Sequence, residues 1–497
     1  MITLINPNLV VQRDDIFTTG IVYMPVGLAY FAASLRSSGF ECTVIDAFGE
    51  NTDRQWVEGN FIFRGLTPSE VVDKINPCSN AIVLYASNIT YHTSLIHIIC
   101  ATRDVFPGIP IIVIENTQAV TSYSLRRTQE AFYDAGADFI ITGEAEKRGI
   151  GLIKMLQRGK TKTDIHIDGI GFRANGKTMY TSPGKTIAHL DDLPFPAWDL
   201  FPLRDYWRLK YAHGPFETNR YLPLLTSRGC PYACRFCVIP ETNRGEWRGR
   251  SARNVVDEME RDLRDFGVRE FHIEDLNPTV NDTRVRAICE EIIGRNLDVI
   301  WKIAAGTKVE TLRDEATLEL MAKAGCRYIS ISPETGSPRV LRLIGKPFDL
   351  DHALRMVRKM SHVGISSQAC FVLGYPGEED LDRQMTRDLV RRLTKAGIDE
   401  IALFIIAPVP GSEIFEEFSG HFEYSQLNFS PSWRRDYGRI NAFRISLYLR
   451  FLLWKVLYHP VKFFRQPINF LRRRFQTKME MVPYRAIKTY LLGRRST

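Results

Sequence analysis

The chain has 497 residues, which is enough for two or three domains that each bury their own core. Its nine cysteines show no disulfide framework, its start lacks a secretory signal, and no apolar stretch approaches the ~20 residues of a transmembrane helix. The net charge is +8, yet sixteen Lys and Arg residues and only two acidic residues follow residue 433. We therefore predict a cytoplasmic protein with a mildly acidic body and a strongly basic tail.

Residues 1–157 alternate short apolar runs with segments of helical periodicity. The strand-like runs lie at residues 3–6, 42–46, 81–85, 111–114 and 139–142. Strands joined by helices predict a parallel, doubly wound sheet with ligands at the carboxyl ends of its strands. No G-x-G-x-x-G follows the first strand, so the dinucleotide fingerprint is missing.

A linker is expected over residues 158–220. Within it, Asn175-Gly176 is the strongest short hairpin signal and predicts a turn between two strands in residues 170–180. The prolines Pro194 and Pro196 then favour an extended crossing segment.

The strand–helix alternation resumes over residues 221–416. Six strands are expected at residues 222–226, 270–274, 299–304, 328–332, 368–373 and 400–405. Six right-handed β/α units predict an incompletely closed barrel, with its site at the carboxyl ends of the strands.

Three cysteines, Cys230, Cys234 and Cys237, directly follow the first of these strands. The spacing C-x3-C-x2-C supplies three thiolates, one fewer than the four that close an ordinary iron–sulfur or structural zinc site. A four-iron cube held in this way keeps one iron open for another ligand. The cysteines are therefore predicted metal ligands at the mouth of the barrel.

Two other interpretations compete with a cluster. A zinc site needs a fourth ligand at metal spacing, but no Cys or His lies between Cys237 and His272. Free cysteines are also often buried as small apolar groups, although three in eight residues beside Gly229 and Pro231 are hard to obtain from packing alone.

The tail, residues 417–497, is expected to be mainly helical. One helix is predicted at residues 442–458, with Phe443, Leu447, Phe451, Trp454 and Tyr458 on one side. Basic residues interleaved with large apolar ones suit the surface of an anionic membrane. The alternative is a helical lid on the barrel. No nucleic-acid-binding motif accompanies the charge.

Several separate motifs in residues 1–416 resemble those of the cobalamin-dependent radical S-adenosylmethionine (SAM) enzymes. Beyond the cysteine motif, the matching segments are PVGLAY at 25–30, GFECTVID at 39–46, ADFIITGEAE at 137–146, residues 191–202, WRGRS at 247–251, SPETGS at 332–337 and FVLGYPGE at 371–378. The resemblance implies an α/β protein with a Rossmann-like cobalamin-binding domain, a partial (β/α)6 radical SAM barrel and a helical extension. It also implies three cofactors, namely a [4Fe-4S] cluster, SAM and cobalamin.

The resemblance assigns SAM contacts to five residues, Phe236, Lys308, Ser332, Glu334 and Gly374. Phe236 matches the residue that packs on adenine, and Ser332 with Glu334 would bond a ribose or an ammonium group. Lys308 stands where relatives often have Arg and would meet the SAM carboxylate as a point charge. The alternatives are loop packing for Phe236, helix capping for Glu334 and an ordinary Pro-Gly turn around Gly374.

Cobalamin contacts are expected at the start of the first helix and at strand ends. These candidates are Pro25, Gly27, Ser87, Asn88, Thr90, Glu115, Asn116, Gly143 and Glu144. The sequence lacks D-x-H-x-x-G, so the resemblance implies cobalt without a protein histidine. It departs from the family at Glu115-Asn116-Thr117-Gln118, where relatives usually carry Gly-Gly-Pro.

The implied activity is methyl transfer to an unactivated carbon of a hydrophobic or amphipathic, lipid-like substrate. One SAM would yield a 5′-deoxyadenosyl radical, and a second would recharge methylcobalamin. The alternatives are an oxidative cyclisation or rearrangement of a porphyrin-like or other substrate, and a non-catalytic iron–sulfur or cobalamin-binding protein. A flavodoxin or ferredoxin is the expected reductant, and the tail predicts contact with the inner face of the membrane.

Overall fold

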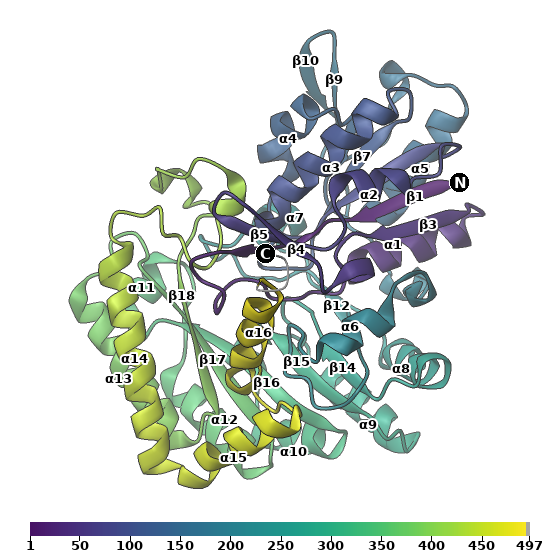
Figure 1. Ribbon diagram of the computed structural model, residues 1–497. Helices are drawn as coiled ribbons and strands as arrows, with labels where there is room; N and C mark the ends of the chain where they lie inside the picture. Colours follow the sequence, from purple (N-terminus) through teal and green to yellow (C-terminus); the bar gives the residue numbers. More distant parts are fainter. Residues whose placement is uncertain (494–497) are drawn as a thin grey trace.

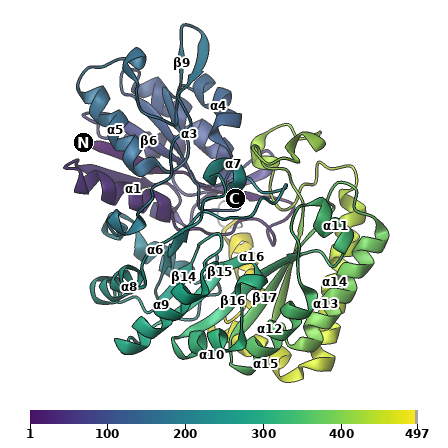
Figure 2. The same cartoon turned by 180° about the vertical axis from the view of Figure 1, so that it is seen from behind.

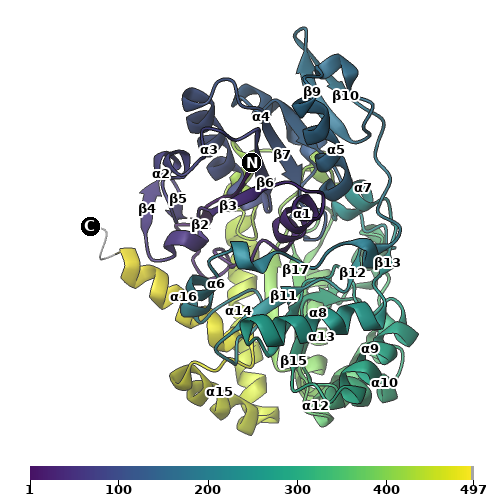
Figure 3. The ribbon, with the colours of Figure 1, turned by 90° about the vertical axis from the view of Figure 1, so that its right-hand side faces the viewer.

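The computed structural model describes residues 1–493 and contains two large sheets with a helical tail (Figure 1). The sheet of the N-terminal half lies over the barrel formed by the middle of the chain, as the side view shows (Figure 3). The tail, drawn in yellow, runs down the outside of the barrel and returns toward the N-terminal half. This arrangement agrees with the predicted α/β fold of parallel sheets.

The N-terminal sheet has seven strands in the order β10-β9-β8-β7-β6-β1-β3. Its five parallel strands are β1 (Ile2–Asn6), β3 (Cys42–Asp46), β6 (Ala81–Ala86), β7 (Ile111–Glu115) and β8 (Phe139–Ile141). All five begin and end within a residue or two of the predicted runs. Almost all of their apolar residues are buried on both faces, because helices cover both sides of the sheet.

One face of this sheet carries α1 (Val26–Ser37) and α5 (Ala145–Gln157), and the other carries α2 (Pro68–Asp73), α3 (His92–Val105) and α4 (Leu125–Asp134). A small antiparallel sheet, β2-β5-β4, stands beside it and was not predicted. Its strands are β2 (Leu9–Gln12), β4 (Gln55–Glu58) and β5 (Phe61–Arg64).

The predicted hairpin forms as β9 (Ile170–Ala174) and β10 (Lys177–Tyr180), with Asn175 and Gly176 both at positive φ. It does not stand in a linker, however, because β9 pairs antiparallel with β8 and extends the N-terminal sheet. The proposed boundary at residue 157 therefore falls inside this domain. Pairing with β9 covers the edge of β8 that would otherwise leave its backbone groups unpaired.

The barrel contains the six predicted parallel strands in sequence order. They are β11 (Tyr221–Leu224), β14 (Glu270–Ile273), β15 (Ile300–Thr307), β16 (Cys326–Glu334), β17 (Ser366–Leu373) and β18 (Glu400–Ile405). The outer helices are α8 (Ala252–Phe266), α9 (Asp282–Gly294), α10 (Glu315–Lys323), α12 (Leu350–His362) and α13 (Asp380–Ala396) (Figure 2). The first and last strands do not pair, so the barrel is open along one side.

The tail forms α14 (Tyr437–Tyr458), α15 (Pro460–Arg472) and α16 (Lys478–Gly493). The turn before α16 and the first residues of α16 span the open side of the barrel. The Phe475 amide donates to the carbonyl of Phe216, just before β11, and the Met479 amide donates to Glu400 on β18, at 2.9 and 2.6 Å. The tail therefore completes the barrel wall, which agrees with the alternative of a lid.

Candidate functional site

The cysteine loop begins beyond β11, after the short strand β12 (Ser227–Arg228). Gly229 has φ +81°, and a Cβ atom there would lie 1.8 Å from the carbonyl oxygen of Glu246. Only glycine fits this approach. Beyond it, the Cys237 amide donates to the Cys234 carbonyl at 3.1 Å, a turn that holds the last two cysteines together.

The three thiols are partly or fully buried, and burial raises all three pKa values. The pKa of Cys234 rises to about 11 and that of Cys237 to about 12. Metal ligation requires thiolates, so a bound iron–sulfur cluster would have to keep these three groups ionised. Across residues 1–493, no three His, Cys, Asp or Glu side chains converge closely enough for a single metal ion. Three thiols on one loop fit the ligand set of a four-iron cluster that keeps one iron open.

The end of β16 faces the cysteine loop. Glu334, its last residue, has φ +65°, an uncommon conformation for a residue with a side chain, and is buried in an ion pair with Lys346. The Lys346 ammonium also lies 6.0 Å from the centre of the Phe236 ring. The structure thus brings Phe236 and Glu334, two of the residues expected to contact SAM, to one place.

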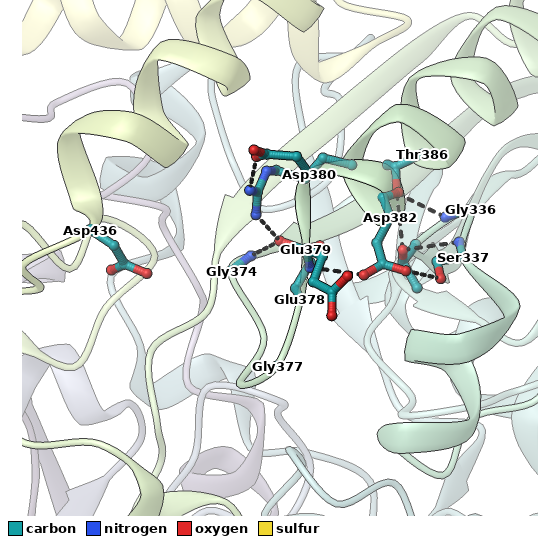
Figure 4. Close-up of polar contacts among 12 residues, drawn as sticks. Gly336, Ser337, Gly374, Gly377, Glu378, Glu379, Asp380, Asp382, Thr386 and Asp436 are labelled. Carbon is teal, nitrogen blue, oxygen red and sulfur yellow. Dashed lines mark hydrogen bonds and ion pairs between the residues drawn. The ribbon is translucent and has the colours of Figure 1, made fainter.

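The loops after β16 and β17 are both anchored to the start of α13 (Figure 4). Thr386 accepts a hydrogen bond from the Gly336 amide at 3.0 Å, and the Ser337 hydroxyl donates to Asp382 at 2.5 Å. On the other loop, Glu378 accepts from the Gly374 amide at 2.7 Å and from Arg383 of α13 at 3.2 Å. These bonds fix the rim of the barrel where SAM contacts are expected.

Two predicted SAM residues have other partners. Lys308 pairs with Glu310 at 3.3 Å and lies 4.9 Å from the Tyr232 ring, so its charge is next to the cysteine loop. Gly374 has φ +81°, and a Cβ atom there would lie 2.7 Å from the side chain of Ile440 on α14. The absence of a side chain at Gly374 therefore allows the tail to approach the barrel closely. The Gly374 amide is already hydrogen-bonded to Glu378.

A cavity of about 670 Å³ lies where the two sheets and the tail meet. Phe236, Ser332 and Glu334 line it from the barrel, and Asn88 and Thr90 line it from the loop after β6. Much of the remaining wall is apolar and comes from β18 and the tail. Predicted contacts for SAM and for cobalamin thus border one space.

Three more predicted cobalamin residues, Pro25, Ser87 and Asn116, line a recess that shares wall residues with this cavity. The Ser87 hydroxyl is buried and, within the described part of the chain, has no hydrogen-bond partner. A buried polar atom without a partner is costly, so this recess suits a ligand with polar groups such as the amides of cobalamin. Gly27 instead lets α1 approach β6, because a Cβ atom there would lie 2.3 Å from the Tyr85 hydroxyl.

The remaining predicted cobalamin residues, Glu115, Gly143 and Glu144, border a different recess. Glu115 accepts from the amides of Gly143 and Leu125 at 2.6 and 2.9 Å, while burial raises its pKa to about 7. Glu144 pairs with Arg248 of the barrel domain at 2.9 Å. Both carboxylates therefore have structural partners, and the WRGRS segment serves in part to join the domains.

The cavity is also bordered by a histidine and two cationic residues that the sequence did not single out. His213, in the segment before β11, bonds to Glu274 at 2.6 Å, and the tail contributes Lys478 and Arg485. His213 had no motif around it. The basic tail was noted only for its total charge, and no local pattern showed that α16 would enter the barrel.

Comparison with known proteins identifies the barrel. Residues 224–390 match the radical SAM superfamily, and this span contains the three cysteines and the strands β14–β17. This chain is a radical SAM enzyme. A radical SAM domain implies a [4Fe-4S] cluster and SAM, which agrees with the open ligand set of the cysteine loop.

Several relatives of this radical SAM enzyme extend beyond the barrel. Cytidylyl-2-hydroxyethylphosphonate methyltransferase of Streptomyces wedmorensis is 27% identical over 449 residues, covering 84% of this chain and 81% of the relative. Anaerobic magnesium-protoporphyrin IX monomethyl ester cyclase of Rubrivivax gelatinosus is 29% identical over 328 residues, covering 64% and 57%. The radical SAM enzyme thus has relatives named for methyl transfer and for cyclisation.

Two solved structures share its overall fold. The radical SAM methyltransferase TsrM of Kitasatospora setae superposes with a TM-score of 0.63 at 17% identity, covering 84% of this chain and 75% of TsrM. The cobalamin-dependent radical SAM enzyme OxsB, solved with aqua-cobalamin, gives 0.63 at 18% identity, covering 89% and 56%. The fold of this chain is therefore that of cobalamin-dependent radical SAM enzymes.

Proposed function

We propose that this chain is a cobalamin-dependent methyltransferase that acts on an unactivated carbon of a hydrophobic or amphipathic substrate. The observation that carries the proposal is the shared cavity, because residues expected to contact SAM and cobalamin line the same space. When bound, the cluster with SAM supplies hydrogen abstraction, and cobalamin supplies a methyl group. A substrate in this cavity would meet both.

The protein's own residues would bind and position these groups. Cys230, Cys234 and Cys237 would hold the cluster, and Phe236 with Glu334 would contact SAM. Asn88, Thr90 and the unpartnered Ser87 hydroxyl would bond to the edge of cobalamin. The largely apolar wall excludes water and suits a hydrophobic substrate body.

A second candidate function is oxidative cyclisation, which the cyclase relatives favour. The two functions can be separated with reconstituted holoenzyme, flavodoxin or ferredoxin as reductant, SAM with a deuterated methyl group, and a total lipid extract as the substrate source. Methyl transfer predicts a lipid-soluble product heavier by one labelled methyl group, together with S-adenosylhomocysteine. Formation of 5′-deoxyadenosine without label transfer would contradict methyl transfer and support the second candidate. The Cys234→Ala variant is the matched control.

The outer surface of the tail supports contact with a membrane. The inner side of α14 buries Leu447 and Phe451 against the barrel domain, but both α14 and α15 also expose an apolar stripe. This stripe consists of Ile445, Leu449, Leu453, Leu457, Val461, Phe464, Ile468 and Leu471. In residues 1–493, no helix has both the length and the hydropathy to cross a bilayer.

Exposed arginines accompany the apolar stripe, namely Arg450, Arg465, Arg472 and Arg473. An exposed apolar surface with arginines beside it is typical of helices that lie in an anionic membrane surface. We infer that the stripe contacts such a membrane at its cytoplasmic side and gives access to a lipid-like substrate. The inner face of the tail can close the barrel at the same time.

Substitutions test this contact better than a deletion, because removing the tail would also remove Lys478 and Arg485 from the cavity. The triple variant Leu449→Ser, Leu453→Ser, Phe464→Ser should float with phosphatidylglycerol-containing vesicles about tenfold less than the unaltered protein. Phe422→Ser, an exposed apolar residue elsewhere, should have no effect. Equal flotation of the triple variant, or equal binding to neutral vesicles, would contradict the membrane contact.

A further inference from the structure

We propose that Arg485, assisted by Lys478, binds an anionic head group of the substrate inside the cavity. This inference rests on the proposed function and names the substrate class more closely, as an amphiphile that carries a carboxylate or a phosphate. Both residues belong to α16, and both line the cavity wall.

Arg485 is a buried cation with too few partners. Only 3% of the residue is exposed, and its single hydrogen bond within the described chain runs from Nη2 to the Phe17 carbonyl at 2.7 Å. Its Nε is buried without a partner, and no carboxylate of residues 1–493 lies within ion-pair distance. A guanidinium has five N–H donors, and leaving it buried without an anion is costly.

The surroundings of Arg485 do not supply that anion. Burial lowers the pKa of Arg485 to about 10, and the groups close enough to oppose this shift are Tyr211, Tyr23, Tyr91 and Asp15. The acidic residue on the same side of the cavity, Asp15, is already paired with Arg444 at 3.2 Å. The free donors of Arg485 therefore suit a ligand oxyanion, which arginine binds with two parallel hydrogen bonds.

Lys478 supplies a second positive charge on the same helix. Its ammonium donates to the Ala304 carbonyl at 3.0 Å and has no ion pair among the described residues. The nearby carboxylate of Glu400 is occupied, since it accepts from the Met479 amide at 2.6 Å and the Tyr328 hydroxyl at 2.5 Å. Two cations on α16 thus face a space whose other walls are largely apolar, an arrangement that suits a charged head and an apolar body.

Binding of simple amphiphiles tests the proposal without requiring turnover. Holoenzyme would be titrated calorimetrically with decanoate, decyl phosphate and decanol below their micelle concentrations. We expect one of the two anions to bind at least tenfold more tightly than decanol, and the stronger anion identifies the head group. Arg485→Met and Lys478→Met should each reduce that preference several-fold, while Arg485→Lys should retain part of it.

The matched control is Lys488→Met, because Lys488 lies on the same helix but does not line the cavity. Cobalamin content and SAM binding should remain unchanged in Arg485→Met, which shows that neither cofactor is the anion. Equal binding of anions and decanol, an unaltered preference in both Met variants, or loss of cobalamin in Arg485→Met would overturn the proposal. Absence of methyl transfer with intact anion preference would instead count against the proposed function alone.

Discussion

Arg228 donates to Glu146 across 2.6 Å, and both side chains are almost completely buried. Arg228 stands two residues before Cys230, and Glu146 belongs to α5 of the N-terminal domain. The guanidinium also lies 5.2 Å from the centre of the Tyr30 ring on α1. This pair therefore fixes the cysteine loop relative to the domain expected to carry cobalamin.

Breaking this ion pair should be strongly destabilising. Glu146→Gln leaves the buried Arg228 beside an uncharged amide, with Glu144 at 3.6 Å as its remaining carboxylate, and we expect a loss of about 3 kcal/mol. The urea midpoint measures this loss, and a cycle with Arg228→Met measures the coupling. Asp199→Asn, which breaks the exposed pair with Arg36 at 2.7 Å, should change stability by less than about 1 kcal/mol. Equal losses at both sites would contradict the structural role of the buried pair.

Gly229→Ala should prevent the cysteine loop from adopting its conformation. The new Cβ would collide with the Glu246 carbonyl oxygen and would also stand at φ +81°. We expect less than a tenth of the normal iron content after reconstitution, measured by the cluster's visible absorption.

Gly245→Ala distinguishes the effect of the steric collision from the effect of backbone strain at positive φ. Gly245 also has a positive φ, +70°, but a Cβ atom there would meet nothing within 4 Å. Its substitution should cost about 1 kcal/mol of stability through backbone strain and leave the iron content near normal. If both variants lost the cluster equally, the close approach at Gly229 would not be the cause.

The sequence predicted the parts of this molecule that local patterns determine. The short apolar runs of the two sheets, the Asn175-Gly176 turn and the three-cysteine loop each carry their signal within a few residues. The placement of β9 beside β8 depends on which sheet edge is free, and nothing in residues 170–180 encodes that. The entry of α16 into the barrel likewise depends on contacts such as Phe475 with Phe216, which are far apart in the chain.

The candidate site shows the same division. Motifs singled out Phe236 and Glu334, which line one cavity because Phe236 lies in the loop after the first barrel strands and Glu334 ends β16. The motifs could not show that Glu144 forms an ion pair with Arg248, since that contact depends on how the N-terminal sheet and the barrel pack together. Arg485 was hidden among sixteen basic residues of the tail, and only its burial without an anion distinguishes it.

Stability should fall in acid partly because of His92. Burial lowers its pKa to about 4, and its ring lies against Tyr123, Phe132 and Tyr424. Because the pKa of His92 is lower in the folded protein than its unfolded value of 6.5, the neutral ring stabilises the fold. This contribution is complete above pH 6.5 and is lost as the pH falls toward the folded-state pKa of about 4. The loss should reach roughly 2–3 kcal/mol.

His92→Gln should flatten the pH dependence of the urea midpoint between pH 6.5 and 4.5, although it lowers stability at neutral pH. His97→Gln is the matched control, because His97 is on the same helix but partly exposed. Identical slopes in His92→Gln and the unaltered protein would show that other groups cause the acid sensitivity.

The cysteine loop makes the most direct prediction. Each of Cys230→Ala, Cys234→Ala and Cys237→Ala removes one thiolate from a set of three, and a four-iron cube cannot be held by two. We expect each variant, reconstituted anaerobically with iron and sulfide, to lack cluster absorption and to form no detectable 5′-deoxyadenosine. Cys289→Ala, in a buried position on α9 away from the loop, should keep both properties at a cost of about 1 kcal/mol in stability. A full cluster in any of the three loop variants would show that another residue supplies a ligand to the cluster. The three cysteines would then not be the complete set of protein ligands.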